Sequence, residues 1–276
     1  MKNAASPTTE KVVVMTGASG GIGRALLETW RNEDARLYLV GRHGAEALRE
    51  QLAADRESRA FQNAKVFAAD LALDGAAQEL AEQILATLRD DQGVDVPRLD
   101  SLVCAAGADL MTPESKSLDF NARLALAWKV DVAAHIALAR SLGDAMRRYW
   151  RAASARPTNA SPCVLFFSWD GADRGLAGES GQIYATCKGA LASFARSLAH
   201  DLAPDVRVNS VAPGWIQTTW GAQASEKATA RAVEQSLLGR WGRADEIAKV
   251  ARFLLDANAS FINAQTIAVN GGFNVR

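Results

Sequence analysis

Short apolar segments alternate with segments of helical periodicity along the chain. In the segments between strands, apolar residues recur three and four positions apart, as Ile22, Leu26 and Trp30 do, which predicts amphipathic helices. The predicted strands are residues 12–15, 37–40, 65–69, 99–105, 163–167, 206–211 and 266–269, and the predicted helices are residues 22–30, 45–54, 76–88, 120–150, 182–202 and 244–255.

The predicted strands are apolar throughout instead of at alternate positions, which is typical of a parallel sheet covered by helices on both faces. We therefore predict one doubly wound α/β domain with a parallel sheet of about seven strands. Residues 1–10 form a polar tail, and residues 11–276 form the domain. Residues 151–162 are the most linker-like segment, but strands continue on both sides of it.

Composition excludes several classes of protein. The chain has 276 residues, 31 Lys+Arg and 31 Asp+Glu, so its formal net charge is zero and it lacks the basic excess of a nucleic-acid-binding protein. No segment has the apolar length of a signal peptide or a membrane span. Three cysteines without a C-x-x-C pair indicate reduced thiols in a cytoplasmic protein, and three scattered histidines indicate no metal site.

A glycine cluster follows the first predicted strand, at residues 16–23 (TGASGGIG). A strand that enters a glycine-rich turn and then a helix brings backbone N–H groups and the helix dipole to one point, where a pyrophosphate binds. The spacing differs from the G-x-G-x-x-G fingerprint, and there is no G-K-[ST] motif. The alternative is a tight turn that binds no ligand.

The second predicted strand ends without the carboxylate that would bind the adenosine ribose of NAD. Arg42 stands there instead, with a planar, permanently charged guanidinium suited to a 2′-phosphate. This favours NADP(H) over NAD(H) as the cofactor. NAD(H) is the alternative if Arg42 is an ordinary solvated loop residue.

Tyr184 and Lys188 are four positions apart on a predicted helix and so share one face. A tyrosine with a pKa near 10 is a poor proton shuttle at neutral pH. Its pKa would have to fall to about 7, which corresponds to roughly 4 kcal/mol, and a neighbouring cation would supply part of this free energy. Alone, this pair is a weak signal, and its position after the fifth predicted strand gives it weight.

Together these motifs resemble the classical short-chain dehydrogenase/reductase family from residue 11 to residue 273, and within it the 3-oxoacyl-[acyl-carrier-protein] reductases through residues 240–247 (RWGRADEI) and the C-terminal stretch. The motifs that carry the resemblance are T-G-x-x-x-G-x-G at 16–23, Asp70-Leu71, A-A-G at 105–107, Ser168, Tyr184-x-x-x-Lys188, P-G-x-x-x-T at 213–218 and V-N-G-G at 269–272.

The resemblance implies a Rossmann-type fold and a catalytic set of Ser168, Tyr184, Lys188 and Asp131. It implies that Tyr184 transfers the proton, Ser168 binds the substrate oxygen, and Lys188 holds the nicotinamide ribose. Asp70 and Leu71 would flank the adenine, and Thr218 would lie near the carboxamide. The implied cofactor-binding residues are Gly17, Ser19, Gly21, Ile22, Gly23, Arg42, Asp70, Leu71, Ala106, Gly107, Tyr184, Lys188, Pro213, Gly214, Ile216 and Thr218.

Three positions depart from the family pattern. Residues 104–107 read C-A-A-G in place of N-N-A-G, and Asp131 stands where the family has an Asn that holds a water of a proton relay. Asp131 could accept hydrogen bonds from water and from Lys188, but it adds a charge. The interval from Ser168 to Tyr184 is 16 positions, about three longer than in the family pattern, so Ser180 is the alternative to Ser168.

We interpret the chain as an NADP(H)-dependent oxidoreductase that interconverts a carbonyl and a secondary alcohol, with a small-molecule substrate or a carrier-protein thioester. The alternatives are an NAD-linked alcohol dehydrogenase and a catalytically silent dinucleotide-binding or regulatory protein. Residues 219–238 would form a substrate lid, and apolar residues on more than one face of the helices predict a homotetramer or a dimer. Trp169, Trp215 and Trp220 would line an apolar pocket or pack in the core, and Arg147, Arg148 and Arg151 would suit an acidic carrier protein or the end of a helix.

Overall fold

The computed structural model describes residues 10–153, 161–218 and 226–273. At its centre lies a seven-stranded sheet in the order β3-β2-β1-β4-β5-β6-β9, and every neighbouring pair is parallel. This confirms the predicted fold class. The strands are β1 (Lys11–Thr16), β2 (Ala35–Gly41), β3 (Lys65–Ala68), β4 (Ser101–Cys104), β5 (Cys163–Phe167), β6 (Arg207–Pro213) and β9 (Thr266–Val269), and the short strands β7 (Ile216–Gln217) and β8 (Gly242–Arg243) pair separately.

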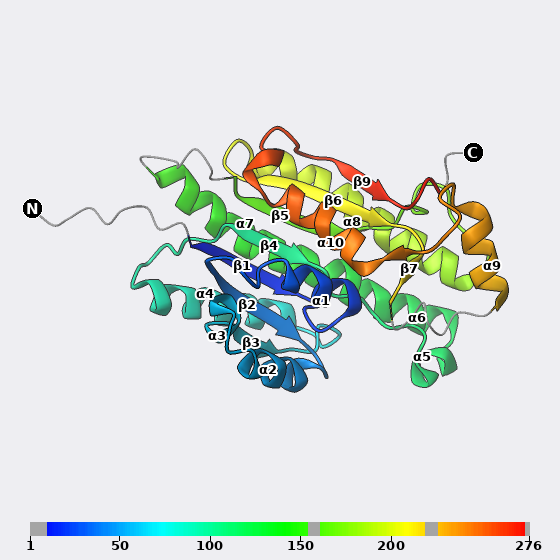
Figure 1. Ribbon diagram of the computed structural model, residues 1–276, viewed down its shortest axis with the longest axis horizontal. Helices are drawn as coiled ribbons and strands as arrows, with labels where there is room; N and C mark the ends of the chain where they lie inside the picture. Colours follow the sequence, from blue (N-terminus) through cyan, green and yellow to red (C-terminus); the bar gives the residue numbers. More distant parts are fainter. Residues whose placement is uncertain (1–9, 154–160, 219–225, 274–276) are drawn as a thin grey trace, which may run out of the picture.

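Helices cover both faces of the sheet (Figure 1). They are α1 (Gly21–Glu28), α2 (Ala45–Ala54), α3 (Arg59–Gln62), α4 (Ala76–Gln92), α5 (Pro113–Ser117), α6 (Phe120–Ala127), α7 (Ala134–Ala152), α8 (Glu179–Leu202), α9 (Glu226–Gln235) and α10 (Ala244–Leu254), with a π-helix η1 (Trp128–Ala133) and a 3-10 helix η3 (Ala257–Ala259). Helices α4, α7 and α8 pack on one face, while α1, α2, α3 and α10 pack on the other.

Strand β1 explains why the predicted strands are apolar without alternation. Val12 and Val14 point into the core beneath α4 and α7, whereas Val13 and Met15 point into the core beneath α1 and α10. All four are almost completely buried. Successive side chains alternate between the two hydrophobic cores, so a polar residue would be buried among apolar side chains at every position of the strand.

The structure differs from the predicted elements in the middle of the chain. The prediction of one continuous α-helix over residues 120–150 is wrong, because the π-helix η1 separates α6 from α7. A local widening of this kind leaves the apolar periodicity on either side almost unchanged, so the pattern does not predict it. Helices α3, α5 and α9 were not predicted either. Part of the predicted lid, residues 219–225, lies outside the described residues.

The strand order creates the position of the site. From β1 the chain builds the sheet outward in one direction through β2 and β3, and then returns to add β4 on the other side of β1. In such sheets a crevice opens at the carboxyl ends of the two strands where the direction reverses. Strands β1 and β4 are that pair here. Within the described part of the chain, no helix is long and apolar enough to cross a membrane.

Candidate active site

The turn after β1 is held close to the end of β4. Gly17 has φ +70°, and an added Cβ would lie 2.6 Å from the carbonyl carbon of Ala105, so only glycine fits. Helix α1 begins with no side-chain cap and no acidic residue in its first turn. Its first backbone N–H groups and its dipole are therefore directed at the crevice, where a phosphate would bind.

Thr16 joins the same two strand ends, a role that sequence reasoning missed. Its Oγ1 accepts hydrogen bonds from the backbone N–H groups of Ala105 (3.1 Å) and Ala106 (3.2 Å). The two alanines stand in the C-A-A-G segment that departs from the family pattern. The threonine hydroxyl thus satisfies two backbone donors at the floor of the crevice.

Two adjoining cavities lie along this crevice, with volumes of about 330 Å³ and 470 Å³. They share Gly17, Gly20 and Gly107 as lining residues, so together they form one extended trough. One end of the trough is at Arg42 and the other is at Tyr184. This shape and the open helix N-terminus between the ends fit an extended dinucleotide with its pyrophosphate at α1.

By this reasoning the first cavity would hold the adenosine end of such a dinucleotide. The predicted cofactor residues that line it are Gly17, Ser19, Arg42, Asp70, Leu71, Ala106 and Gly107. Arg42 Nη1 lies 4.0 Å from Asp70 Oδ1, and both side chains are partly exposed. The guanidinium is thus available at the rim with its charge only partly compensated by a screened, long ion pair.

The second cavity gathers the remaining predicted residues except Asp131. They are Gly21, Ile22, Gly23, Ser168, Tyr184, Lys188, Pro213, Gly214, Ile216 and Thr218. Thr218 lies directly against the turn, because a Cβ on Gly21 would lie 2.9 Å from the methyl carbon of Thr218. Asp131 lies behind this cavity and lines a small neighbouring one together with Tyr184 and Lys188.

Lys188 and Asp131 form a buried ion pair. Lys188 Nζ lies 2.6 Å from Asp131 Oδ1 and also donates to the backbone oxygen of Phe167 at 3.3 Å. The other carboxylate oxygen of Asp131 accepts from the backbone N–H of Ala108 at 2.9 Å. Asp131 is carried by η1, and π-turns of this kind occur frequently at functional sites. The carboxylate therefore connects α8 to the loop after β4.

Ser168 follows β5 and is buried beside the same lysine. Its Oγ donates to the backbone oxygen of Lys188 at 3.0 Å, and its N–H donates to Val211. Ser180, the alternative, is exposed at the start of α8, and its Oγ accepts from Arg123 at 3.0 Å. Both serines line the second cavity, but only Ser168 lies at the end of a central strand. Its position supports the register that matches Ser168.

Tyr184 lies in an environment that favours its protonated form. Burial raises the pKa of the phenol, and the negative charges of Asp131 and Asp109 raise it further, while Arg123 opposes them. Asp109 is a second site residue that sequence reasoning missed, since nothing in its neighbourhood marks it as chemical. The lowering of this pKa by Lys188 that the sequence predicts is wrong here, because burial and the nearby carboxylates dominate and Lys188 is already paired with Asp131. The phenol therefore keeps its proton.

His135 lies behind the ion pair and was expected to be one of three unrelated histidines. Its Nδ1 is 3.1 Å from the backbone oxygen of Asp131, and its Nε2 is 3.5 Å from Oγ1 of Thr16. Burial and the charge of Lys188 lower the pKa of His135 to about 4. The imidazole is therefore neutral and links η1 to the end of β1. Among the described residues no three His, Cys, Asp or Glu side chains are grouped to hold a metal ion.

Aromatic side chains form part of the wall of the second cavity. Trp169 packs edge-on against Tyr184, with ring centroids 6.2 Å apart, and Trp215 packs on the buried Trp241 at 5.5 Å. Trp169 and Trp215 both line the cavity. Trp220, the third tryptophan expected near the pocket, lies outside the described residues.

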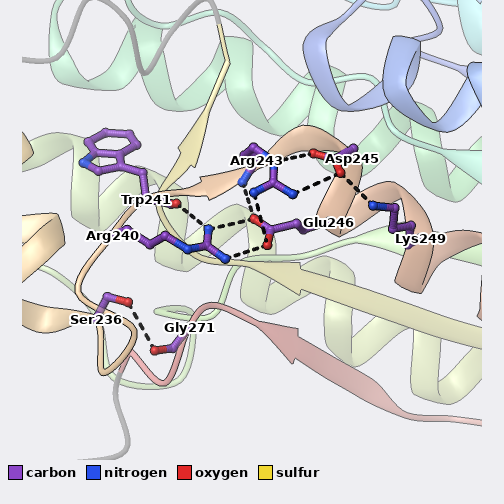
Figure 2. Close-up of polar contacts among 8 residues, drawn as sticks. All are labelled: Ser236, Arg240, Trp241, Arg243, Asp245, Glu246, Lys249 and Gly271. Carbon is purple, nitrogen blue, oxygen red and sulfur yellow. Dashed lines mark hydrogen bonds and ion pairs between the residues drawn. The ribbon is translucent and has the colours of Figure 1, made fainter.

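A network of charged residues fixes the segment that carries Trp241 (Figure 2). Arg240 makes two hydrogen bonds to Glu246, at 2.9 Å and 2.6 Å, and a third to the backbone oxygen of Trp241. Glu246 also accepts from the backbone N–H of Arg243 and so caps α10. The motif at 240–247 thus holds β8 and Trp241 in place behind Trp215.

The arginine cluster at the end of α7 is engaged by nearby carboxylates. Arg147 and Arg148 both contact Asp144, at 2.6 Å and 3.1 Å, and Arg151 contacts Asp205 at 2.8 Å. These pairs agree with the interpretation that the cluster stabilises the end of a helix.

Comparison with known proteins identifies relatives along almost the whole chain. A family model described as enoyl-(acyl carrier protein) reductase matches residues 17–274. The 3-oxoacyl-[acyl-carrier-protein] reductase FabG of Aquifex aeolicus is 31% identical over 269 residues, which are 95% of this chain and 96% of the relative.

Solved structures agree with this. The short-chain dehydrogenase/reductase (glucose/ribitol dehydrogenase) of Brucella melitensis has a TM-score of 0.77 at 28% identity, and the match covers 96% of this chain and 97% of the other. A 3-oxoacyl (acyl-carrier-protein) reductase of Agrobacterium tumefaciens with NADP bound has a TM-score of 0.75 at 25% identity, over 95% of this chain and 94% of the other.

Proposed function

The chain belongs to the classical short-chain dehydrogenase/reductase family of NAD(P)-dependent oxidoreductases, and from this we propose that it is an NADP(H)-dependent carbonyl reductase. The observation that carries the proposal is the convergence of Ser168, Tyr184 and Lys188 on one cavity that opens onto the glycine-rich turn. A silent binding protein would not need a buried proton donor at that place.

The choice of NADP(H) rests on the rim of the first cavity. Arg42 lines it where the second strand ends, and its guanidinium would bind a 2′-phosphate with charge-assisted hydrogen bonds. The NADP bound to the Agrobacterium tumefaciens structure supports this choice by similarity.

The mechanism we propose uses residues of this chain for binding and proton transfer. A bound nicotinamide dinucleotide would supply the hydride. Tyr184 would give its proton to the carbonyl oxygen, and the hydroxyl of Ser168 would orient that oxygen. Lys188 would hold the cofactor ribose, with its ammonium fixed by Asp131 on one side and by the carbonyl of Phe167 on the other.

We further infer a symmetric homo-oligomer, either a tetramer or a dimer. The apolar residues of the predicted helix 120–150 that suggested a contact surface are buried or half-buried within the chain, namely Leu124, Leu126, Val130, Val132, Ile136, Leu138 and Leu142. Exposed apolar surface occurs elsewhere, at Trp128, Phe253 and Phe261, and Phe261 is fully exposed. Large exposed aromatic side chains of this kind are typical of protein contact surfaces.

NADPH oxidation against a panel of ketones, 3-oxoacyl thioesters and quinones tests the proposed function. We expect turnover with at least one carbonyl compound. Tight NADPH binding together with no turnover on the whole panel would favour the silent binding protein.

A further inference from the structure

The cavity beside Tyr184 has a wall made largely of apolar side chains. This wall is formed by Leu110, Met111, Trp169, Leu176 and Trp215. Four of the five are only half-buried in the protein, so they have apolar surface left for a ligand to cover. Covering such surface is the usual source of affinity for small molecules in pockets of this kind.

The two tryptophans are held in place by the protein. The ring of Trp169 packs against Tyr184 and lies over Gly171, where an added Cβ would overlap it. Trp215 packs against Trp241, whose indole N–H donates to the backbone oxygen of Thr229 at 3.4 Å. Rigid aromatic surfaces bind apolar and aromatic groups with little loss of conformational freedom.

The charges around this cavity give an anion no partner. Among the described residues that line it, the only charged ones are Lys188 and Asp109. Lys188 is already paired with Asp131 at 2.6 Å, and Asp109 is itself negative.

Arg123 is a further cation near Tyr184, and its Nε is buried with no hydrogen-bond partner in the described part of the chain. Its two terminal nitrogens bond to Glu179 (3.3 Å) and to Ser180 (3.0 Å), and it does not line the cavity. A carboxylate in the cavity would therefore lose hydration without gaining a counter-charge, which is costly.

We propose that the substrate is a small neutral ketone with an aromatic or branched apolar substituent, and that substrates bearing a carboxylate on that substituent are rejected. The inference rests on the proposed function, because it takes the cavity at Tyr184 as the substrate site. It adds a substrate class that the family alone does not define. The neutral ketone would place its apolar part against Trp169 and Trp215, with its oxygen toward Tyr184.

A matched pair of ligands tests this by binding. Para-isopropylacetophenone and para-acetylbenzoate have similar shapes, and only the second carries a charge. Isothermal titration into protein saturated with NADP⁺, where no reduction takes place, should give at least about tenfold tighter binding for the neutral ketone. Equal binding, or tighter binding of the carboxylate, would overturn the proposal.

A cation added to the cavity wall should reverse the preference. We expect Met111→Arg to tighten the binding of para-acetylbenzoate at least about tenfold. Leu118→Arg, which adds the same charge at an exposed position outside the cavity, should leave it unchanged. The same response in both variants would place the ligand elsewhere and overturn the proposal.

The binding preference and the proposed function can fail separately. If the neutral ketone binds as expected but is not reduced when NADPH replaces NADP⁺, the proposed function fails and the binding preference stands.

Discussion

The ammonium of Lys188 lies 2.6 Å from a carboxylate oxygen of Asp131, and both side chains are buried. The family pattern has a neutral asparagine at the position of Asp131, so this chain adds a negative charge directly behind the tyrosine and lysine that we propose as catalytic. The charge fixes the lysine and also acts on Tyr184, whose pKa it raises in addition to the effect of burial. The phenol thus carries the proton that reduction requires, but its raised pKa makes it a weaker acid than an exposed tyrosine.

We predict that Asp131→Asn moves the alkaline limb of kcat/KM for carbonyl reduction to lower pH. The reason is that Tyr184 must carry its proton to donate it, so reduction fails as pH rises through its pKa. Removal of the negative charge lowers that pKa. Steady-state rates across pH measure the limb.

The control for this prediction is Asp74→Asn. Asp74 pairs with Lys129 of the same π-helix at 2.9 Å, but its side chain is almost fully exposed. Its substitution should therefore leave the pH profile of kcat/KM unchanged. An unchanged limb in Asp131→Asn, or an equal shift in both variants, would show that the carboxylate of Asp131 does not act on Tyr184.

Arg42→Ala should weaken NADPH binding by about 1–3 kcal/mol and change NADH binding little, because only NADPH carries the 2′-phosphate. Dissociation constants of both cofactors for both proteins measure the effect. Arg49→Ala is a matched control, since Arg49 lies on α2 outside the cavity and pairs with Glu46. Unchanged NADPH affinity in Arg42→Ala would remove the basis for choosing NADP(H).

Ser168→Ala should reduce kcat/KM by about 100-fold, and Ser180→Ala should cost far less. Ser168 is buried at the end of β5 beside Lys188, whereas Ser180 is exposed and occupied by Arg123. Steady-state kinetics of the two variants decide between them. The reverse order would assign the substrate oxygen to Ser180.

Light scattering at micromolar concentration should give a mass of two or four times the 29.4 kDa of one chain. The exposed Phe253 and Phe261 would lie within an interface, so Phe261→Asp should lower the mass or destabilise the assembly. A clean monomer for the unmodified chain would contradict the inferred oligomer.

Local sequence patterns were enough to predict the parts of the site that one element supplies. The glycine turn depends on a strand, a turn and a helix in direct succession, and Tyr184 and Lys188 share a face of α8 because of their spacing. The fold class followed in the same way from the alternation of apolar segments and helical periodicity.

Contacts between distant segments could not be predicted from such patterns. Thr16 is joined to Ala105 and Ala106 only because β1 and β4 are neighbours, and His135 meets Thr16 although 119 positions separate them in the sequence. The ion pair of Asp131 with Lys188 depends on how η1 packs on α8. These contacts follow from the strand order and from helix packing, which the spacing of single residues does not determine.

The central claim is that Tyr184 donates the proton in an NADPH-dependent carbonyl reduction, and Tyr184→Phe tests it most directly. NADPH oxidation with the best ketone of the panel and NADPH affinity should be measured for the unmodified protein, for Tyr184→Phe and for the control Tyr149→Phe, which changes a tyrosine of α7 outside the site. We predict that Tyr184→Phe lowers turnover by about 100-fold or more while NADPH still binds, and that Tyr149→Phe changes neither. Substantial turnover in Tyr184→Phe would contradict the account.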